Sequence, residues 1–359
     1  SRCMATHGMS PYLPTFSVSL LFGMVMVRIS LPMAHRVDLL ASPGGHRRHE
    51  GKVPLTGGLA MVLAATAATF LLEVPVDYGL SIGVLLLLLV GVMDDRFSLP
   101  YVIRFAVQIA AMMLLLLVDH VRLEDFGQAF GEASGDLGAW SGFLTVFAGV
   151  GVINAINMVD GMDGLAGSLA LVCLIGGALL ISVSPTGDPT LVVVISGVLA
   201  GFLVFNLRLG SRTSARVFMG DAGSMVLGLF LSWMLIRYSQ GADRAFSPVL
   251  ALWLLALPLY DAVGVLLRRP LRGGSPFNAD WRHTHHLMLR LGIGPGKSLA
   301  ILLIISVSFA LFGTVMAAQG VAESIMFSAF LGLFLIYLLL MEVGERLARS
   351  IAGTGDVGN

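Results

Sequence analysis

Long apolar runs alternate with short polar segments along nearly the whole chain. Eleven of these runs approach the roughly 20 residues that an α-helix needs to cross about 30 Å of hydrocarbon. The pattern predicts an all-α, polytopic integral membrane protein of about 11 transmembrane helices, with residues 1–359 forming a single domain. The predicted spans lie near residues 15–33, 57–73, 78–93, 101–118, 140–158, 164–184, 190–206, 217–236, 247–267, 298–317 and 323–342.

Basic residues are distributed unevenly between the two sides that eleven spans create. Seventeen of the 22 Lys and Arg residues fall in loops on one side and four on the other, with Arg28 inside a span. Cytoplasmic loops of membrane proteins carry the excess of Lys and Arg, so the N-terminus is predicted outside and the C-terminus in the cytoplasm. The predicted cytoplasmic loops cover about residues 34–56, 94–104, 158–164, 207–217 and 268–297.

Composition supports the membrane class and excludes others. Hydrophobic residues make up 56% of the chain and charged residues only 12%, whereas soluble domains carry about 25% charged residues. Lys+Arg and Asp+Glu tie at 22 each, so net charge gives no argument for a nucleic-acid partner. The two cysteines, Cys3 and Cys173, are too few for a disulfide framework or a zinc site.

Acidic residues mark three places where predicted spans meet the cytoplasmic side. They are Asp94 with Asp95, Asp160 with Asp163, and Asp221. Charged groups near the hydrocarbon are costly, so such residues call for a functional explanation. The alternative for each is structural: a solvated helix end, a polar turn between two spans, or a simple helix cap.

The segment NAINMVDGMDG suggests a metal site. Asn154, Asn157, Asp160 and Asp163 recur every three residues, which places them near one face of a helix, and we expect their side chains to point together. Such oxygen ligands suit Mg²⁺ or Mn²⁺, which typically takes one or two protein carboxylates and keeps positions for water and substrate phosphates. Asp221, in the sequence MGDAGS, is a further candidate ligand.

The last cytoplasmic loop is basic and rich in histidine. His283, His285 and His286 lie within four residues, but no Cys or carboxylate at a suitable spacing completes a zinc site. Imidazole and guanidinium groups together form a cradle for a diphosphate through charge-assisted hydrogen bonds. Lys52, in the first cytoplasmic loop, is a candidate for a second phosphate contact. Hard-metal ligands beside a phosphate cradle predict phosphoryl transfer.

Five sequence motifs, which follow one another in the order typical of the family, resemble those of the polyprenyl-phosphate N-acetylhexosamine-1-phosphate transferases, which include bacterial enzymes. The motifs are PLTGG at 54–58, MDD at 93–95, NAINMVDGMDGLAGS at 154–168, FMGDAGSM at 218–225 and SPFNADWRHTHHLMLRLG at 275–292. The H-x-H-H pattern is similar to that of the members that use UDP-N-acetylglucosamine and undecaprenyl phosphate. The resemblance implies Mg²⁺, or Mn²⁺ in its place, with UMP as the second product.

The resemblance also implies residue roles and a setting. Asp221 and Asn157 match metal-binding positions, and Asp94 matches a proposed base for the lipid phosphate. Asp95, Asp160 and Asp163 match acidic positions near the active centre, Asn154 a substrate-binding position, and Arg269, His283, His285 and His286 the loop that contacts diphosphate and sugar. The family implies a homodimer in the bacterial inner membrane, with a periplasmic N-terminus, an active site facing the cytoplasm and a product for O-antigen or enterobacterial common antigen synthesis.

Three alternatives stay open from the sequence. A transporter or lipid flippase also has many spans with a few buried charges, although no paired interrupted spans suggest inverted repeats here. The same chemistry on another UDP-N-acetylhexosamine is a second alternative. A covalent aspartyl-phosphate intermediate is the third, against direct attack of the lipid phosphate on the UDP-sugar.

Overall fold

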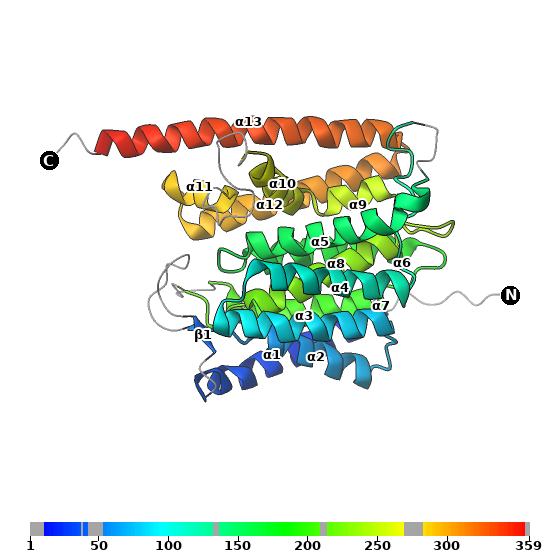
Figure 1. The fold of residues 1–359 in the computed structure, drawn as a ribbon, viewed down its shortest axis with the longest axis horizontal. Helices are drawn as coiled ribbons and strands as arrows, with labels where there is room; N and C mark the ends of the chain where they lie inside the picture. Colours follow the sequence, from blue (N-terminus) through cyan, green and yellow to red (C-terminus); the bar gives the residue numbers. More distant parts are fainter. Residues whose placement is uncertain are drawn as a thin grey trace.

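The computed structural model describes residues 11–36, 39–41, 53–131, 136–208, 214–268 and 283–355. Nearly all of the regular structure is helical, and the long helices run side by side in one bundle (Figure 1). In that view α13 lies along one edge of the bundle and α1 with α2 along the opposite edge. The prediction of a helical bundle is therefore confirmed.

The element bounds are as follows. The helices are α1 Tyr12–Arg36, α2 Gly57–Leu71, α3 Tyr78–Phe97, α4 Tyr101–Leu117, α5 Ser141–Val159, α6 Leu165–Val183, α7 Thr190–Asn206, α8 Gly220–Arg237, α9 Pro248–Leu254, α10 Ala256–Arg268, α11 Thr284–Arg290, α12 Pro295–Ala318 and α13 Glu323–Gly355, with a 3₁₀ turn η1 at Gly138–Trp140. Two short antiparallel strands, β1 Leu40–Ala41 and β2 Val53–Pro54, pair where the chain enters α2.

Ten of the predicted spans coincide with one helix each, and the span near 247–267 covers two. These helices differ in their capacity to cross a membrane. Six of those in the described ranges are long and apolar enough, or seven if one bent pair counts as a single span. Helices α2, α4 and α7 are apolar but shorter. At 1.5 Å per residue, the 15 residues of α2 reach only about 22 Å, less than the hydrocarbon thickness. The protein is thus a helical membrane protein, and the count of eleven spans and their orientation stay predictions.

The span predicted near 247–267 is formed by two helices, a break that the sequence-based prediction of one span did not include. Helices α9 and α10 meet at Leu255 with a bend of 85°. Pro258 explains the break, because a proline has no N–H to donate and its ring clashes with the carbonyl four residues earlier. That residue is Leu254, the last residue of α9. The bend redirects α10 within the bundle.

Helix α8 lies at the centre of the bundle and contacts α2, α3, α4, α5, α6 and α9. Most of its side chains are buried, as expected for a helix that is apolar on all sides. Its N-terminal half is held unusually close to its neighbours by small residues: a Cβ added at Gly91 of α3 would overlap Ala222, and one at Gly58 of α2 would overlap Gly223. Small residues at helix crossings let backbones approach closely in membrane proteins.

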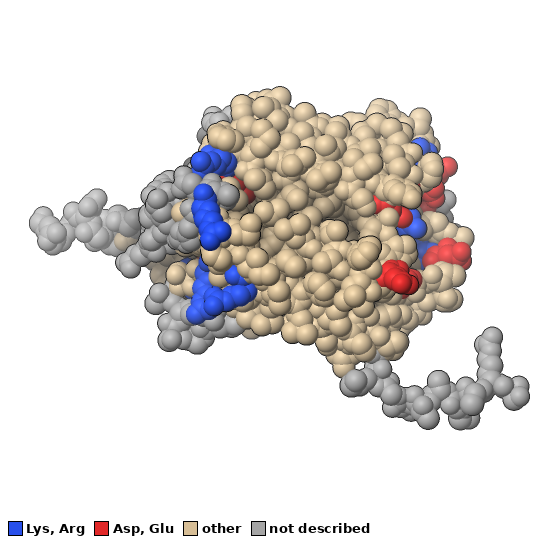
Figure 2. All heavy atoms as spheres, turned by 90° about the horizontal axis from the view of Figure 1, so that it is seen from below, with Lys and Arg blue, Asp and Glu red and all other residues tan. Residues whose placement is uncertain are grey.

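Charge separates along the bundle axis. Figure 2 shows Lys and Arg gathered at the end that carries β1 and α11, and most of the visible Asp and Glu at the other end, where fewer basic residues accompany them. Uncharged surface covers the middle of the molecule in this view. This distribution matches the charge asymmetry from which the orientation is predicted.

The contact between Gly91 and Ala222 leads to a test of packing. We expect Gly91→Ala to lower the free energy of unfolding by about 1–3 kcal/mol, because the new methyl group forces α3 away from α8. Gly151→Ala in α5 is the matched control, since a Cβ there meets no atom within 4 Å. It should be neutral or stabilising by up to about 1 kcal/mol. Thermal unfolding in detergent measures both, and equal midpoints for the two variants would contradict the packing described.

Candidate active site

The last turn of α3 buries a carboxylate, that of Asp94, which is only 6% exposed. Ser98 ends the helix in a left-handed conformation (φ 52°), so that the chain turns back and the Leu99 N–H donates to Asp94 Oδ1 at 2.6 Å. Arg104, from the first turn of α4, pairs with Asp94 Oδ2 through Nη1 at 2.8 Å. The bend between α3 and α4 thus brings this guanidinium to the end of α3.

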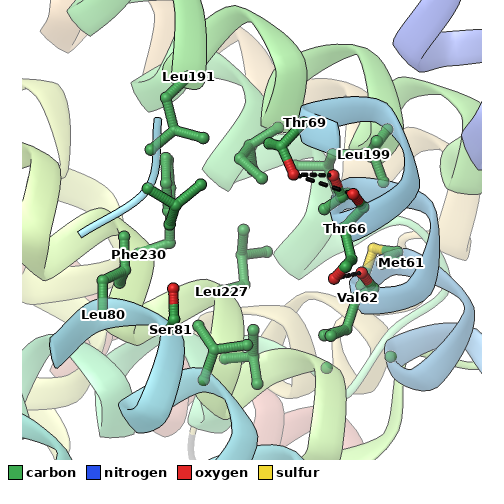
Figure 3. A pocket seen from close by; sticks show the side chains of 18 of the residues that line it. Met61, Val62, Thr66, Thr69, Leu80, Ser81, Leu191, Leu199, Leu227 and Phe230 are labelled. Carbon is green, nitrogen blue, oxygen red and sulfur yellow. Dashed lines mark hydrogen bonds between the residues drawn. The ribbon is translucent and has the colours of Figure 1, made fainter. Parts of the chain in front are cut away.

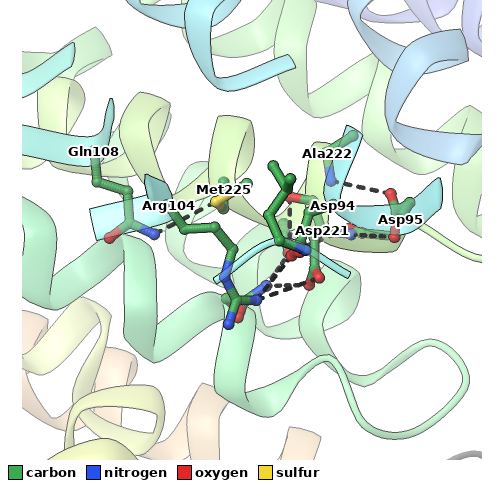
Figure 4. A network of polar contacts seen from close by, with 11 residues as sticks. Asp94, Asp95, Arg104, Gln108, Asp221, Ala222 and Met225 are labelled. Atoms are coloured by element: carbon green, nitrogen blue, oxygen red, sulfur yellow. Dashed lines mark hydrogen bonds and ion pairs between the residues drawn. The ribbon is translucent and has the colours of Figure 1, made fainter. Parts of the chain in front are cut away.

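A second carboxylate meets the same guanidinium. Asp221, in the first turn of α8, lies with its Oδ2 3.5 Å from Arg104 Nη1 (Figure 4). Asn157 of α5 donates through Nδ2 to Asp221 Oδ1 at 2.6 Å and to Ser224 Oγ at 2.9 Å. Residues from four helices therefore converge here, and we call Asp94, Arg104, Asn157 and Asp221 the carboxylate centre.

Asp95 has a different role in the geometry from its neighbour. Its Oδ1 accepts the Asp221 N–H at 3.0 Å and its Oδ2 the Ala222 N–H at 3.3 Å, so it caps the N-terminus of α8 (Figure 4). A Cβ at Gly220, which has φ +71°, would overlap this carboxylate. Glycine at that position therefore allows Asp95 to hold α8 in place. The role of Asp95 in catalysis, predicted from the sequence, is untested.

The four oxygen-bearing side chains of NAINMVDGMDG do not share one helical face, contrary to expectation. Helix α5 ends at Val159, and Gly164 at φ +78° redirects the chain into α6. Asn154, one turn before Asn157, donates to Gln108 Oε1 at 2.7 Å, whereas Asp163 accepts from Arg208 Nε at 2.8 Å. Asp160 is the residue directly after α5. Of the four, Asn157 is hydrogen-bonded to Asp221.

The histidines lie at the start of α11, close to the loop after α5. His283 bonds through Nδ1 to Asp261 Oδ2 of α10 at 2.6 Å. His285 is 1% exposed, and a Cβ at Gly161 would overlap its Nε2, so its ring rests on the 160–163 turn. The ring of His286 is 4.1 Å from that of His285, centroid to centroid. The histidine motif at the start of α11 thus packs against the turn that carries the aspartate motif.

Burial changes the charge of one histidine. Loss of hydration, and secondarily the neighbouring His286 ring, lower the pKa of His285 to about 3. His285 is therefore neutral near pH 7, so it would meet a phosphate as a neutral ring and not as an imidazolium. Any imidazolium contact with a phosphate falls to His283 or His286.

Two predicted site residues, Lys52 and Arg269, lie outside the described residues. Conversely, the structure adds residues that the sequence reasoning missed. Arg104 was counted only as a topology determinant, and nothing in the local pattern links it to Asp221. Asp261 could have been recognised from the sequence as a candidate functional residue, because it is an acidic residue inside the apolar run LPLYDAVGVLL.

A cavity of about 310 Å³ lies between α2, α3, α7 and α8 (Figure 3). Most of its lining is apolar, including Leu80, Leu199 and Leu227. The hydroxyls of Thr66 and Thr69 donate to carbonyls of their own helix, Val62 and Ala65. This cavity therefore suits hydrocarbon and offers no recognition for a nucleotide or a phosphate.

The described residues hold no cluster of three or more His, Cys, Asp or Glu placed to bind a metal ion. The carboxylate centre nevertheless fits Mg²⁺, which takes few protein ligands. Two carboxylates there already share one cation, the Arg104 guanidinium, and an asparagine amide lies beside them. Two carboxylates beside a single guanidinium leave negative charge that a divalent cation would balance.

Fold and site together define a membrane-embedded helical enzyme with an acidic centre at one end of its bundle. Residues 78–239 match the family model described as glycosyl transferase family 4. The chain is 34% identical over 339 residues to the undecaprenyl-phosphate α-N-acetylglucosaminyl 1-phosphate transferase of Yersinia pestis, covering 92% of each chain. The Escherichia coli K12 and Haemophilus influenzae proteins of the same name are 33% and 31% identical, with 91% and 94% of their lengths covered. The chain therefore belongs to glycosyl transferase family 4.

The capping of α8 by Asp95 leads to a prediction. Asp95→Ala should cost about 1–2 kcal/mol of stability and most of the transferase activity, because α8 loses the cap that positions Asp221. Asp119→Ala is the matched control: its carboxylate accepts the N–H groups of Gly79 and Leu80, capping α3 at the end remote from Asp94. That variant should lose similar stability and keep its turnover. Thermal unfolding and turnover, measured on both, test the cap; an active Asp95→Ala would refute it.

Proposed function

We propose that this protein transfers N-acetylglucosamine 1-phosphate from UDP-N-acetylglucosamine to undecaprenyl phosphate, giving undecaprenyl-diphosphate N-acetylglucosamine and UMP. The names of the relatives, matched over nine-tenths of the chain, support the substrates. The observation that carries the chemistry is the convergence of Asp94 and Asp221 on Arg104. Phosphoryl transfer depends on such positioning of charge around the phosphates.

In the proposed reaction an oxygen of the lipid phosphate attacks the β-phosphorus of the UDP-sugar. The new P–O bond forms as the bond from that phosphorus to the bridging oxygen breaks, and UMP leaves with the bridging oxygen and its electron pair. A lipid phosphate is already largely ionised near neutral pH, so a base contributes little unless the attacking oxygen is protonated. Asp94 is the candidate for that base, and its burial beside Arg104 holds it at a fixed place.

Mg²⁺, or Mn²⁺ in its place, would be held by Asp221 with Asn157, beside Asp94. When bound, it would neutralise charge on the diphosphate. Arg104 uses Nη1 for both carboxylates and has further N–H groups with which to bind a phosphate oxygen. His283, His286, Lys52 and Arg269 remain candidates for contacts to the diphosphate and sugar.

The setting completes the proposal. We place the enzyme in the bacterial inner membrane with the carboxylate centre at the cytoplasmic face, because the basic end of the bundle carries α11 (Figure 2). UDP-sugars are made in the cytoplasm, which agrees with this orientation. A homodimer and a product for O-antigen or enterobacterial common antigen synthesis belong to the same proposal.

UMP release tests the function directly. Purified protein in liposomes should release UMP from UDP-N-acetylglucosamine only with undecaprenyl phosphate and Mg²⁺ present. Asp221→Asn should lower turnover by about 10²- to 10³-fold, the loss typical of removing one charge-stabilising group from a reaction centre. Asp188→Asn, an equal charge change at the exposed turn before α7, is the control and should be fully active.

Other outcomes of this assay identify the alternatives. Movement of lipid or sugar without UMP would indicate a transporter. Greater turnover of another UDP-N-acetylhexosamine would change the donor substrate and leave the chemistry intact. An active Asp221→Asn would remove Asp221 from the metal site.

Direct attack also makes a prediction of its own. Protein incubated with Mg²⁺ and UDP-N-acetylglucosamine radiolabelled in the β-phosphate, without lipid acceptor, should retain no label after denaturation. The reason is that no carboxylate of the protein forms a bond to phosphorus in a one-step transfer. Label that remains attached in wild type and is lost in Asp94→Asn would establish the covalent intermediate instead.

A further inference from the structure

Asp261 is a buried carboxylate that the proposed transfer does not use. It lies in α10, three residues after Pro258, and is 2% exposed. An ionised carboxylate inside a membrane protein is expensive unless it is well supplied with donors. Its partners therefore indicate why it is there.

Four hydrogen bonds reach the two oxygens of Asp261. Oδ2 lies 2.6 Å from His283 Nδ1. Oδ1 accepts the Thr284 N–H at 2.8 Å, the Thr284 hydroxyl at 2.6 Å and the Tyr337 hydroxyl at 3.0 Å. The donors come from the start of α11 and from α13, so the carboxylate holds three helices together in one orientation.

A carboxylate can only accept, so His283 must carry a proton on Nδ1 to make its bond to Asp261. The neutral ring then presents Nε2 as an acceptor, and the protonated ring presents it as a donor. An oriented carboxylate behind an imidazole fixes both tautomer and ring position in the same way in metal sites and catalytic triads. Asp261 thus determines which nitrogen of His283 is left for other partners.

Asp261 also fixes the backbone of α11. It accepts from the N–H of Thr284, the first residue of that helix. The other end of α11 is held to α13 by Arg290, which pairs with the buried Glu345. Between the two ends, Leu287 packs in a small core with Met341 and Ala348. Helix α11 is therefore held to α13 along its length, with His285 turned onto Gly161.

We propose that Asp261 is a positioning residue for the donor substrate: it locks His283 in the Nδ1–H form and fixes the first turn of α11, so that Nε2 of His283 faces the UDP-sugar. The identity of the ligand rests on the proposed function, whereas the tautomer lock does not. Tyr337, through its hydrogen bond to Asp261, supports the same arrangement from α13.

Asp261→Asn tests the lock. Three donors keep the amide oxygen at the Oδ1 position, so the NH₂ group must face His283 Nδ1 and donate to it. The ring then moves its proton to Nε2. NMR of protein with ring-¹⁵N-labelled histidine in nanodiscs, at a pH where the ring is neutral, should show Nδ1–H in wild type and Nε2–H in the variant. A His283→Gln spectrum assigns the signals.

Steady-state kinetics provide the second readout. The KM for UDP-N-acetylglucosamine should rise by up to about tenfold in Asp261→Asn, because an Nε2 that carries the proton can no longer accept a hydrogen bond from the UDP-sugar. The KM for undecaprenyl phosphate should stay within about twofold, because the donor side alone is disturbed. A general loosening of the fold would instead change both KM values together.

Glu345→Gln is the matched control, because it weakens the other end of α11 without touching the His283 ring. It should lower the unfolding temperature and leave the tautomer and the KM for the UDP-sugar unchanged. A wild-type ring with no proton on Nδ1, or an unchanged tautomer in Asp261→Asn, would overturn the proposal. The wild-type spectrum shows whether Nδ1 of His283 carries the proton, so it tests the tautomer even if the variant fails to fold. This test is independent of whether UMP is released from UDP-N-acetylglucosamine.

Discussion

The approach of two carboxylates to one guanidinium is the constraint on which the site depends. Asp94 and Asp221 belong to α3 and α8, and like charges do not stay close unless packing and a shared cation hold them. The cation in the structure is Arg104. The packing comes from residues without bulk, because Gly91 against Ala222 and Gly58 against Gly223 let three helix backbones approach. Asp95 then fixes the position of α8 by capping its N-terminus. The acidic centre is thus a product of helix packing as much as of the acidic residues themselves.

A second group of contacts joins the histidine motif to that centre. The carboxylate centre lies inside the region that matches the family model, 78–239, whereas α10, α11 and α13 lie beyond it. The break that Pro258 imposes redirects α10, which carries the Asp261 that holds α11. Where His285 meets Gly161, the two groups of helices touch. Burial keeps that histidine neutral, while His283 remains available for a polar contact.

Much of this arrangement could be predicted from the chain, and the limits have physical causes. Apolar runs predicted every long helix, because hydrocarbon tolerates little else. The break at Leu255 was missed, although Pro258 indicates it, since a proline inside an apolar run does not reveal how far the helix bends. The repeat from Asn154 to Asp163 suggested one shared helical face; the glycines end the helix first, and Asp163 pairs with Arg208 instead. The roles of Arg104 and Arg208 could not be predicted, because their partners lie in distant segments of the chain that only tertiary packing brings close.

Asp221 and Asn157 are the proposed ligands of the divalent cation beside Asp94. Electron paramagnetic resonance of Mn²⁺ added to the purified protein measures this without any turnover. Wild type should take up Mn²⁺ when UDP-N-acetylglucosamine is present, Asp221→Asn should lose this binding, and Asp163→Asn should retain it because Asp163 is paired with Arg208. Equal binding of Mn²⁺ by wild type and Asp221→Asn would overturn this assignment.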